Sequence, residues 1–219
     1  TGLIYKFMDD MDQESVELGG EKSFFIGDYE KYAWRKLFDS KLGGEDKVKL
    51  YSEAIENMYL NPTAPQLFRE IFKNAFLPFR DPSTLNMFLK EINEFHYSHS
   101  EKLGDAFEYL ISIMGSQGDA GQFRTPRHII DFIVEIVNPQ KHESVLDPAC
   151  GTAGFLISSY KYILKTNTDK KLGDQLSSDD RKKIGENLIG YDISPEMIRL
   201  SLVNMYLHGF QTPKIEEYD

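Results

Sequence analysis

The stretch that decides the fold runs from residue 144 to residue 164 and reads SVLDPACGTAGFLISSYKYIL. Its first three residues favour a strand, and they lead into Asp147-Pro148. A loop of small residues then extends to Gly154, and an apolar run with helical spacing follows it. A strand, a tight loop with two glycines and a helix, in this order, predict one half of a parallel α/β unit.

A second strand and helix follow in the same order. The sequence LIGYD at residues 188–192 is a strand candidate, and residues 194–207 begin with Ser-Pro-Glu and continue as an apolar run. Proline in the first turn and Gly209 just past the end are typical of helix boundaries. Strand, helix, strand and helix indicate a right-handed βαβ unit with a parallel sheet. We expect the charged residues 165–187 to form an exposed insertion.

The first half of the chain has a different pattern. Aromatic-rich apolar stripes at helical spacing extend to about residue 100, and another amphipathic segment covers residues 103–114. Such stripes usually form a core rather than a cofactor site. A glycine-rich joint, GSQGDAGQ, begins at residue 115. The pattern predicts an α/β protein with an α-helical N-terminal domain (1–115), followed by part of a Rossmann-like sheet (116–219).

The composition limits the possible functions. The 219 residues carry a formal net charge of −10, which argues against a domain that grips DNA by itself, because phosphate binding needs clustered Lys and Arg. A subunit that acts on nucleic acid beside a more basic partner stays possible. The sequence shows no run long enough to cross a bilayer, no signal peptide and a single cysteine, Cys150. These features favour a reducing, cytoplasmic location without membrane association.

The loop after the first strand has the chemistry of a ligand site. Ligands of open parallel sheets bind beyond the carboxyl ends of the strands, and Gly151 and Gly154 would let a ligand approach the backbone closely. A dinucleotide usually needs G-x-G-x-x-G, which is absent, and Asp147 would repel its pyrophosphate. S-adenosylmethionine carries ammonium and sulfonium groups that Asp147 would attract, and backbone N–H groups can bind its carboxylate. The loop therefore indicates S-adenosylmethionine as the cofactor.

Asp192 ends the second strand candidate and allows two interpretations. A carboxylate there could hold the ribose diol of the cofactor, because it can accept two hydroxyl hydrogen bonds. Asp192 could equally be the N-terminal cap of the helix at Pro195. The presence of Asp147 at the end of the neighbouring strand favours the ribose.

The motifs DPACGTAGF (147–155) and GQFRTP (121–126) form a specific pair. Together they resemble the modification subunit of type I restriction–modification systems, an N6-adenine DNA methyltransferase. The segments YKFMDDMDQESVELGG, LGDAFEYLI and LIGYDISPEMIRLSLVNMYLHGF extend the resemblance over essentially the whole chain. The resemblance implies that residues 116–219 hold the first part of a sheet of the S-adenosylmethionine-dependent methyltransferase type.

The resemblance also implies a set of cofactor contacts. Phe123 would pack against the cofactor, Thr125 would donate to its carboxylate, and Asp219 would contact its adenine amino group. Arg124 stands where many relatives carry a tyrosine. The expected cofactor-binding residues are Gln122, Phe123, Thr125, Asp147, Pro148, Ala149, Gly151, Thr152, Gly154, Phe155, Asp192, Ile193 and Asp219.

The implied activity is N6-adenine methylation of double-stranded DNA, beside a specificity subunit that reads the DNA and a restriction subunit. The adenine amino group would attack the sulfonium methyl in line, after the base has left the duplex. In this family an Asn-Pro-Pro-Phe-type motif grips that amino group. It is absent from residues 1–219, so we assign no catalytic residue and expect the segment alone to be inactive. The alternatives are a single-chain restriction–methylation enzyme and a non-catalytic assembly module with a vestigial cofactor fold.

Two further candidates have simpler explanations. His96 and His99 lie three residues apart, but no third ligand is near in sequence, so we expect no metal. Cys150 lies in a tight loop, where a small side chain fills space, and we do not expect it to be a nucleophile.

Overall fold

The structure is a computed structural model that describes residues 1–79, 81–95, 100–116 and 125–218, with the side chains of the third range described for residues 103–111. The chain divides into two compact units, Thr1–His96 and Tyr97–Asp219. His96 and His99 lie outside the described residues.

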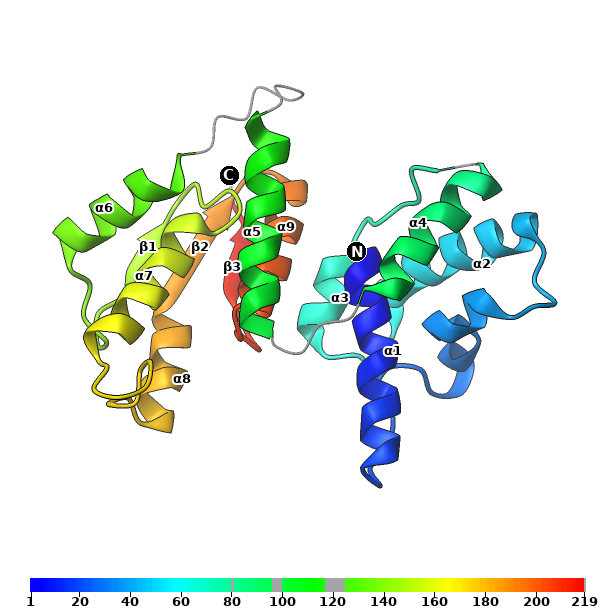
Figure 1. Cartoon of the computed structure of the whole chain (residues 1–219), viewed down its shortest axis with the longest axis horizontal. Coiled ribbons are helices and arrows are strands. Elements are labelled where there is room, and N and C mark those ends of the chain that lie inside the picture. Colours follow the sequence, from blue (N-terminus) through cyan, green and yellow to red (C-terminus); the bar gives the residue numbers. More distant parts are fainter. Residues whose placement is uncertain (80, 96–99, 117–124, 219) are drawn as a thin grey trace. The chain divides into compact units, whose positions relative to one another are not determined.

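The first unit is helical, as the aromatic stripes predicted (Figure 1). Its core is built around Tyr5, whose ring centroid lies 5.2 Å from that of Trp34, 5.8 Å from that of Tyr51 and 5.9 Å from that of Phe25. These rings are buried, so the stripes form a core. The elements are α1 (Gly2–Glu17), α2 (Gly44–Asn57), α3 (Gln66–Phe72), α4 (Pro82–Glu94) and the short 3-10 helices η1 (Gly27–Tyr32), η2 (Trp34–Phe38) and η3 (Met58–Leu60).

The second unit contains a small parallel sheet of three strands in the order β1-β2-β3. The helix α7 packs on β1 and β2, and α9 packs on β2 and β3. The strand and helix order that the sequence predicted is therefore observed. The elements are α5 (Ser100–Ser116), α6 (Arg127–Val137), β1 (Val145–Asp147), α7 (Gly154–Thr166), α8 (Ser178–Asn187), β2 (Leu188–Asp192), α9 (Pro195–Leu207) and β3 (Lys214–Glu217).

Helix α5 belongs to the second unit, whereas the sequence predicted a domain boundary near residue 115. The helix packs against α9, and the two meet where Gly104 faces the imidazole of His208. A Cβ at Gly104 would lie only 2.7 Å from that ring. The amphipathic pattern of α5 shows that it has a buried face, but it does not show which element covers that face.

The centre of the sheet has no room for a side chain at Gly190. A Cβ there would lie 2.7 Å from Cδ1 of Ile215 and 3.0 Å from both Sγ of Cys150 and Cδ1 of Leu156. Gly190 is paired with Asp147 of β1. The glycine thus lets β3, the loop after β1 and the first turns of α7 approach one another closely.

The charged segment 165–187 is only partly an exposed insertion, because it contains α8. Ser177 and Asp180 form a capping box at the start of this helix. Ile184 is buried, whereas most of its neighbours in the helix are exposed. A single buried apolar residue in a polar helix leaves almost no periodic signal, which is why the sequence did not predict α8.

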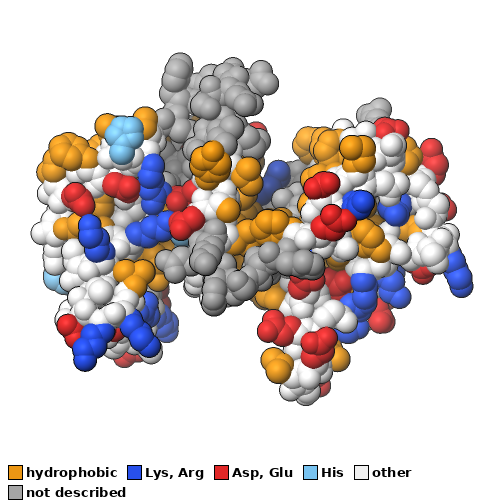
Figure 2. All heavy atoms as spheres, viewed as in Figure 1, with side chains coloured by type: hydrophobic (Ala, Val, Ile, Leu, Met, Phe, Trp, Pro, Cys, Tyr) orange, Lys and Arg blue, Asp and Glu red, His pale blue; other side chains and the backbone are white. Residues whose placement is uncertain are grey.

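Helix α6 is apolar on two faces. Ile130 is buried near Gly154 of α7, and Val134 is also buried. Phe132 and Ile136 are 60% and 67% exposed, and Figure 2 shows hydrophobic side chains at the surface over this helix. Among the described residues, no helix is both long enough and apolar enough to cross a membrane.

Candidate functional site

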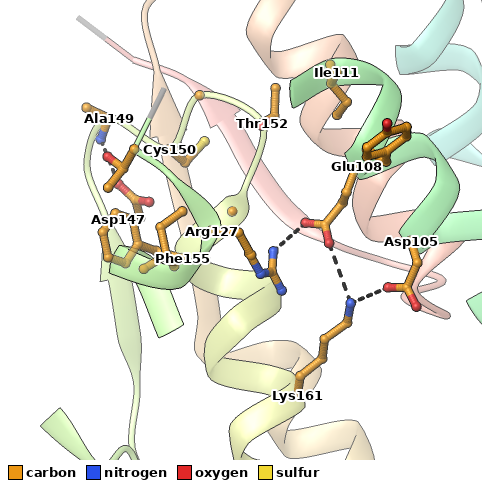
Figure 3. Close-up of a pocket in the computed structure, with 15 residues that line it drawn as sticks. Asp105, Glu108, Ile111, Arg127, Asp147, Ala149, Cys150, Thr152, Phe155 and Lys161 are labelled. Carbon is orange, nitrogen blue, oxygen red and sulfur yellow. Dashed lines mark hydrogen bonds and ion pairs between the residues drawn. The ribbon is translucent and has the colours of Figure 1, made fainter. Parts of the chain in front are cut away.

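A cavity of about 470 Å³ lies beside the carboxyl end of β1 (Figure 3). The loop between β1 and α7 borders it on one side, and α5 and α6 contribute further walls. The lining residues are Asp105, Glu108, Tyr109, Ile111, Thr125, Arg127, Ile130, Asp147, Ala149, Cys150, Gly151, Thr152, Gly154, Phe155 and Lys161.

Hydrogen bonds to backbone groups of the loop after β1 hold it in place. The N–H of Cys150 donates to the carbonyl of Tyr191 at 2.8 Å, and the side-chain amide of Asn204 donates to the carbonyl of Thr152 at the same distance. Gly151 and Ala153 have φ values of 54° and 65°, in the left-handed region. Glycine adopts this conformation without steric cost. The loop is therefore tied to both β2 and α9.

Asp147 is a half-buried carboxylate at the end of β1. Burial raises its pKa, the N–H of Ala149 at 3.2 Å acts in the opposite direction, and the charge of Asp192 raises the pKa further. Within the described part of the chain, Asp147 forms no ion pair with a Lys or Arg. The surroundings of Asp147 therefore disfavour its ionised form when no cation is near. A cationic ligand beside Asp147 would stabilise that form.

Asp192 binds two backbone groups. Its Oδ2 accepts from the N–H of Gly151 at 2.9 Å, and its Oδ1 accepts from the N–H of Ser194 at 2.8 Å. The N-cap of α9 is Ser194, whose Oγ accepts from the N–H of Met197. The interpretation of Asp192 as the helix cap is therefore wrong. A carboxylate has further lone pairs, and the ribose contact stays a prediction.

The structure brings most of the predicted cofactor residues together. Pro148 and Ile193 are exposed and do not line the cavity, and neither does Asp192. Gln122, Phe123 and Asp219 lie outside the described residues. The predicted residues that line the cavity are Thr125, Asp147, Ala149, Gly151, Thr152, Gly154 and Phe155.

Sequence reasoning missed a charged wall of the cavity. Lys161 of α7 donates to Asp105 at 2.5 Å and to Glu108 at 3.5 Å, and Arg127 of α6 donates to Glu108 at 2.6 Å (Figure 3). Asp105 and Glu108 lie three residues apart and so share a face of α5. That spacing was visible in LGDAFEYLI, but their cationic partners are distant in sequence.

His208 lies beside the two carboxylates of this wall. Its Nδ1 lies 2.8 Å from the carbonyl of Asn204, and its buried Nε2 lies 3.7 Å from oxygens of Asp105 and Glu108. Burial is the main reason that the pKa of His208 is lowered. The three side chains have the composition of a metal site, but the ammonium of Lys161 already bonds both carboxylates. The cluster is therefore an ion-pair network with its own cation.

We expect the thiol of Cys150 to be unreactive. The residue is 5% exposed, and burial together with the charges of Asp147 and Asp192 raises the pKa of its thiol to about 12. Because the thiolate is the reactive form, a thiol reagent such as dithionitrobenzoate should label the folded protein slowly and the denatured protein fully. Rapid labelling under native conditions would contradict this burial.

Comparisons with known proteins show the family of the chain. The model of the family described as N-6 DNA Methylase matches residues 98–219, more than half of the chain and almost the whole second unit. The type I restriction enzyme EcoEI methylase subunit of Escherichia coli is 26% identical over 96% of this chain and 44% of its own length. The EcoKI methylase subunit of Escherichia coli strain K12 is 29% identical over 83% of this chain and 35% of its own length.

A solved structure shows a similar fold. The crystal structure described as a modification subunit of a type I restriction enzyme from Vibrio vulnificus has a TM-score of 0.68 and 25% identity, over 100% of this chain and 49% of that one. The chain thus spans about half, or less, of the length of these relatives. With the family model covering the cavity and its loop, the chain belongs to the N-6 DNA methylase family.

Proposed function

We propose that the chain binds S-adenosylmethionine in the cavity beside β1 and acts as the modification subunit of a type I restriction–modification complex, which methylates adenine N6 in double-stranded DNA. The observation that carries the proposal is Asp147, a half-buried carboxylate of raised pKa without a cationic partner among the described residues. A sulfonium amino acid supplies the positive charge that this position favours.

The residues of the cavity fit this cofactor. The volume of about 470 Å³ lies within the roughly 300–1,000 Å³ of small-molecule sites. Asp147 would hold the ammonium group, Thr125 would bind the carboxylate, and the backbone at Gly151 would lie close to the ligand. Asp192 does not line the cavity, but it fixes Gly151, which does, and it would hold the ribose diol of a ligand that extends past this loop. When bound, S-adenosylmethionine supplies an activated methyl group, and the described residues orient it for transfer.

The DNA and the protein partners belong to the same proposal. The relatives are methylase subunits of type I restriction enzymes by name. The net charge of −10 fits a subunit that depends on a specificity subunit to read DNA, with a restriction subunit in the same complex. The protein would be located in the cytoplasm. We assign no catalytic residue within residues 1–219, and the group that grips the adenine amino group stays unassigned.

The test is transfer of a labelled methyl group to DNA that offers many adenine contexts, by the full-length protein with its specificity subunit. We expect labelled N6-methyladenine, and strongly reduced transfer with Asp147→Asn. Label on cytosine, or no transfer by a complex that binds DNA, would contradict the proposal. Robust labelling by residues 1–219 alone would place the amino-gripping group within this segment.

A single-chain arrangement is the second candidate. The type II restriction enzyme and methyltransferase RM.BcgI of Heyndrickxia coagulans is 34% identical over 49% of this chain and 16% of its own length. Methyl transfer by one polypeptide without a specificity subunit would favour this arrangement. A protein that assembles with partners but does not bind S-adenosylmethionine would be a non-catalytic assembly module.

The affinity for S-adenosylmethionine should decrease as the pH is lowered. The pKa of Asp147 is raised, mainly by burial, so this carboxylate becomes protonated at a higher pH than an ordinary aspartate. The neutral acid no longer attracts the ammonium group. Titrations downward from about pH 7, where the amino group of the ligand is already an ammonium, should therefore show a loss of affinity that Asp147→Asn, already weak at neutral pH, does not show. If the affinities of the two proteins changed in parallel with pH, Asp147 would not be the residue that binds the ammonium group.

A further inference from the structure

Two carboxylates of α5 connect this helix to the two helices across the cavity. Glu108 uses both of its oxygens: Oε1 accepts from Nη1 of Arg127 on α6 at 2.6 Å, and Oε2 accepts from Nζ of Lys161 on α7 at 3.5 Å. Asp105 binds the same ammonium group at 2.5 Å. Nε of Arg127 also lies 3.2 Å from Asp131 of its own helix. Glu108 thus joins three helices at one point of the cavity wall.

This arrangement differs from an ordinary surface ion pair. The side chain of Glu108 is 18% exposed, and those of Arg127 and Lys161 are 36% and 30% exposed. Isolated exposed pairs contribute little, because water screens them. Here two cations share one largely buried acceptor, and each pair is screened less. All three residues line the cavity, as Figure 3 shows.

The position of the two cations in the sequence links them to the cofactor loop. Arg127 is the first residue of α6 and follows Thr125-Pro126 directly. Lys161 lies on α7, which begins at Gly154, the last glycine of the loop. The bonds from Glu108 therefore fix the start of α6 and the middle of α7, and both of these helices line the cavity. Small displacements of such walls weaken the binding of a ligand whose contacts need a defined geometry.

We propose that Glu108 is a positioning residue of the cofactor site: it holds Arg127 and Lys161 and so fixes α5 against the start of α6 and the middle of α7. This inference rests on the proposed function, because the bound molecule is taken to be S-adenosylmethionine. Glu108 acts through Arg127 and Lys161, and the ligand is held by the loop between β1 and α7.

The test compares two Glu→Gln variants of the full-length protein. Glu108→Gln keeps the size of the side chain but removes its charge, and we expect the dissociation constant for S-adenosylmethionine to rise about tenfold, or ~1.4 kcal/mol. The matched control is Glu135→Gln. Glu135 pairs with Lys165 at 3.5 Å between the same helices α6 and α7, but it does not line the cavity. We expect this control to bind like the unmodified protein.

A double-mutant cycle with Arg127→Met separates positioning from independent effects. If Glu108 acts through Arg127, the double variant should bind about as well as the weaker single variant, whereas independent contributions would add. Additive losses, or equal affinities of the Glu108 and Glu135 variants, would overturn the inference. If Glu108→Gln does not fold, Glu108→Asp replaces it, because its shorter side chain would lose the 2.6 Å contact with Arg127 while keeping the charge.

The proposed function and this inference fail in different ways. An unmodified protein that does not bind S-adenosylmethionine would contradict the proposed function, whatever the variants do. An unmodified protein that binds, with a Glu108→Gln variant that binds equally well, would contradict only the role of Glu108. Thermal unfolding of each variant shows whether a loss of affinity merely reflects a loss of stability.

Discussion

Replacing Asp192 by alanine should raise the dissociation constant for S-adenosylmethionine roughly a hundredfold or more. Two effects act together. The variant loses a carboxylate that would bind the ribose diol, and hydrogen bonds to a charged group contribute about 1.5–3 kcal/mol each. It also loses the acceptor for the N–H groups of Gly151 and Ser194, so the loop that lines the cavity is no longer fixed. Calorimetric titration of the full-length protein measures the change.

The conservative variant Asp192→Asn separates the two effects. An asparagine can still accept one backbone hydrogen bond through its carbonyl oxygen, but it cannot accept from two hydroxyl groups and both N–H groups at once. Its affinity should therefore lie between those of the alanine variant and the unmodified protein. If Asp192→Ala folds and binds the cofactor with unchanged affinity, Asp192 has only a structural role in the turn before α9.

Replacing Gly190 by alanine should destabilise the second unit by about 1–3 kcal/mol, the usual cost of overpacking a core. The added Cβ would lie 2.7 Å from Cδ1 of Ile215 and 3.0 Å from Sγ of Cys150. Both neighbours are buried, so the strand or the loop must move. Thermal or urea unfolding measures the loss, and the displaced loop should also weaken cofactor binding.

Gly185→Ala is the control for this substitution. Gly185 lies in α8, and a Cβ there would make ordinary contacts of 3.7–3.9 Å with the ring of Phe210. Alanine is a better helix former than glycine by about 1 kcal/mol, so this variant should be as stable as the unmodified protein or slightly more stable. Equal stabilities of the two alanine variants would mean that Gly190 is not tightly enclosed.

The sequence predicted best those elements whose boundaries are marked by turn or helix-capping residues. The strand at residues 188–192 was predicted with its observed bounds, because LIGYD is apolar and Ser-Pro-Glu follows it at once. The loop after β1 was predicted as a ligand site from its acid and its two glycines. The loop lines a cavity, and the binding of a ligand there stays a prediction. In each case the signal lies within a few consecutive residues.

The features that the sequence did not predict depend on contacts between distant residues. Lys161 and Asp105 are 56 positions apart and meet only because α7 and α5 border the same cavity. Local sequence motifs therefore could not predict the charged wall. The same limit applies to α5, whose buried face was clear while its partner α9 was not. It also applies to α8, where only Ile184 faces the core.

The central claim is that the loop between β1 and α7 binds S-adenosylmethionine through Asp147. The most direct measurement is a calorimetric titration of the full-length protein with S-adenosylmethionine, repeated with NAD⁺ in excess and with the Asp147→Asn variant. We predict saturable binding that NAD⁺ does not compete with and that the variant weakens strongly. Absence of binding, competition by NAD⁺, or an Asp147→Asn variant that binds as well as the unmodified protein would contradict the claim.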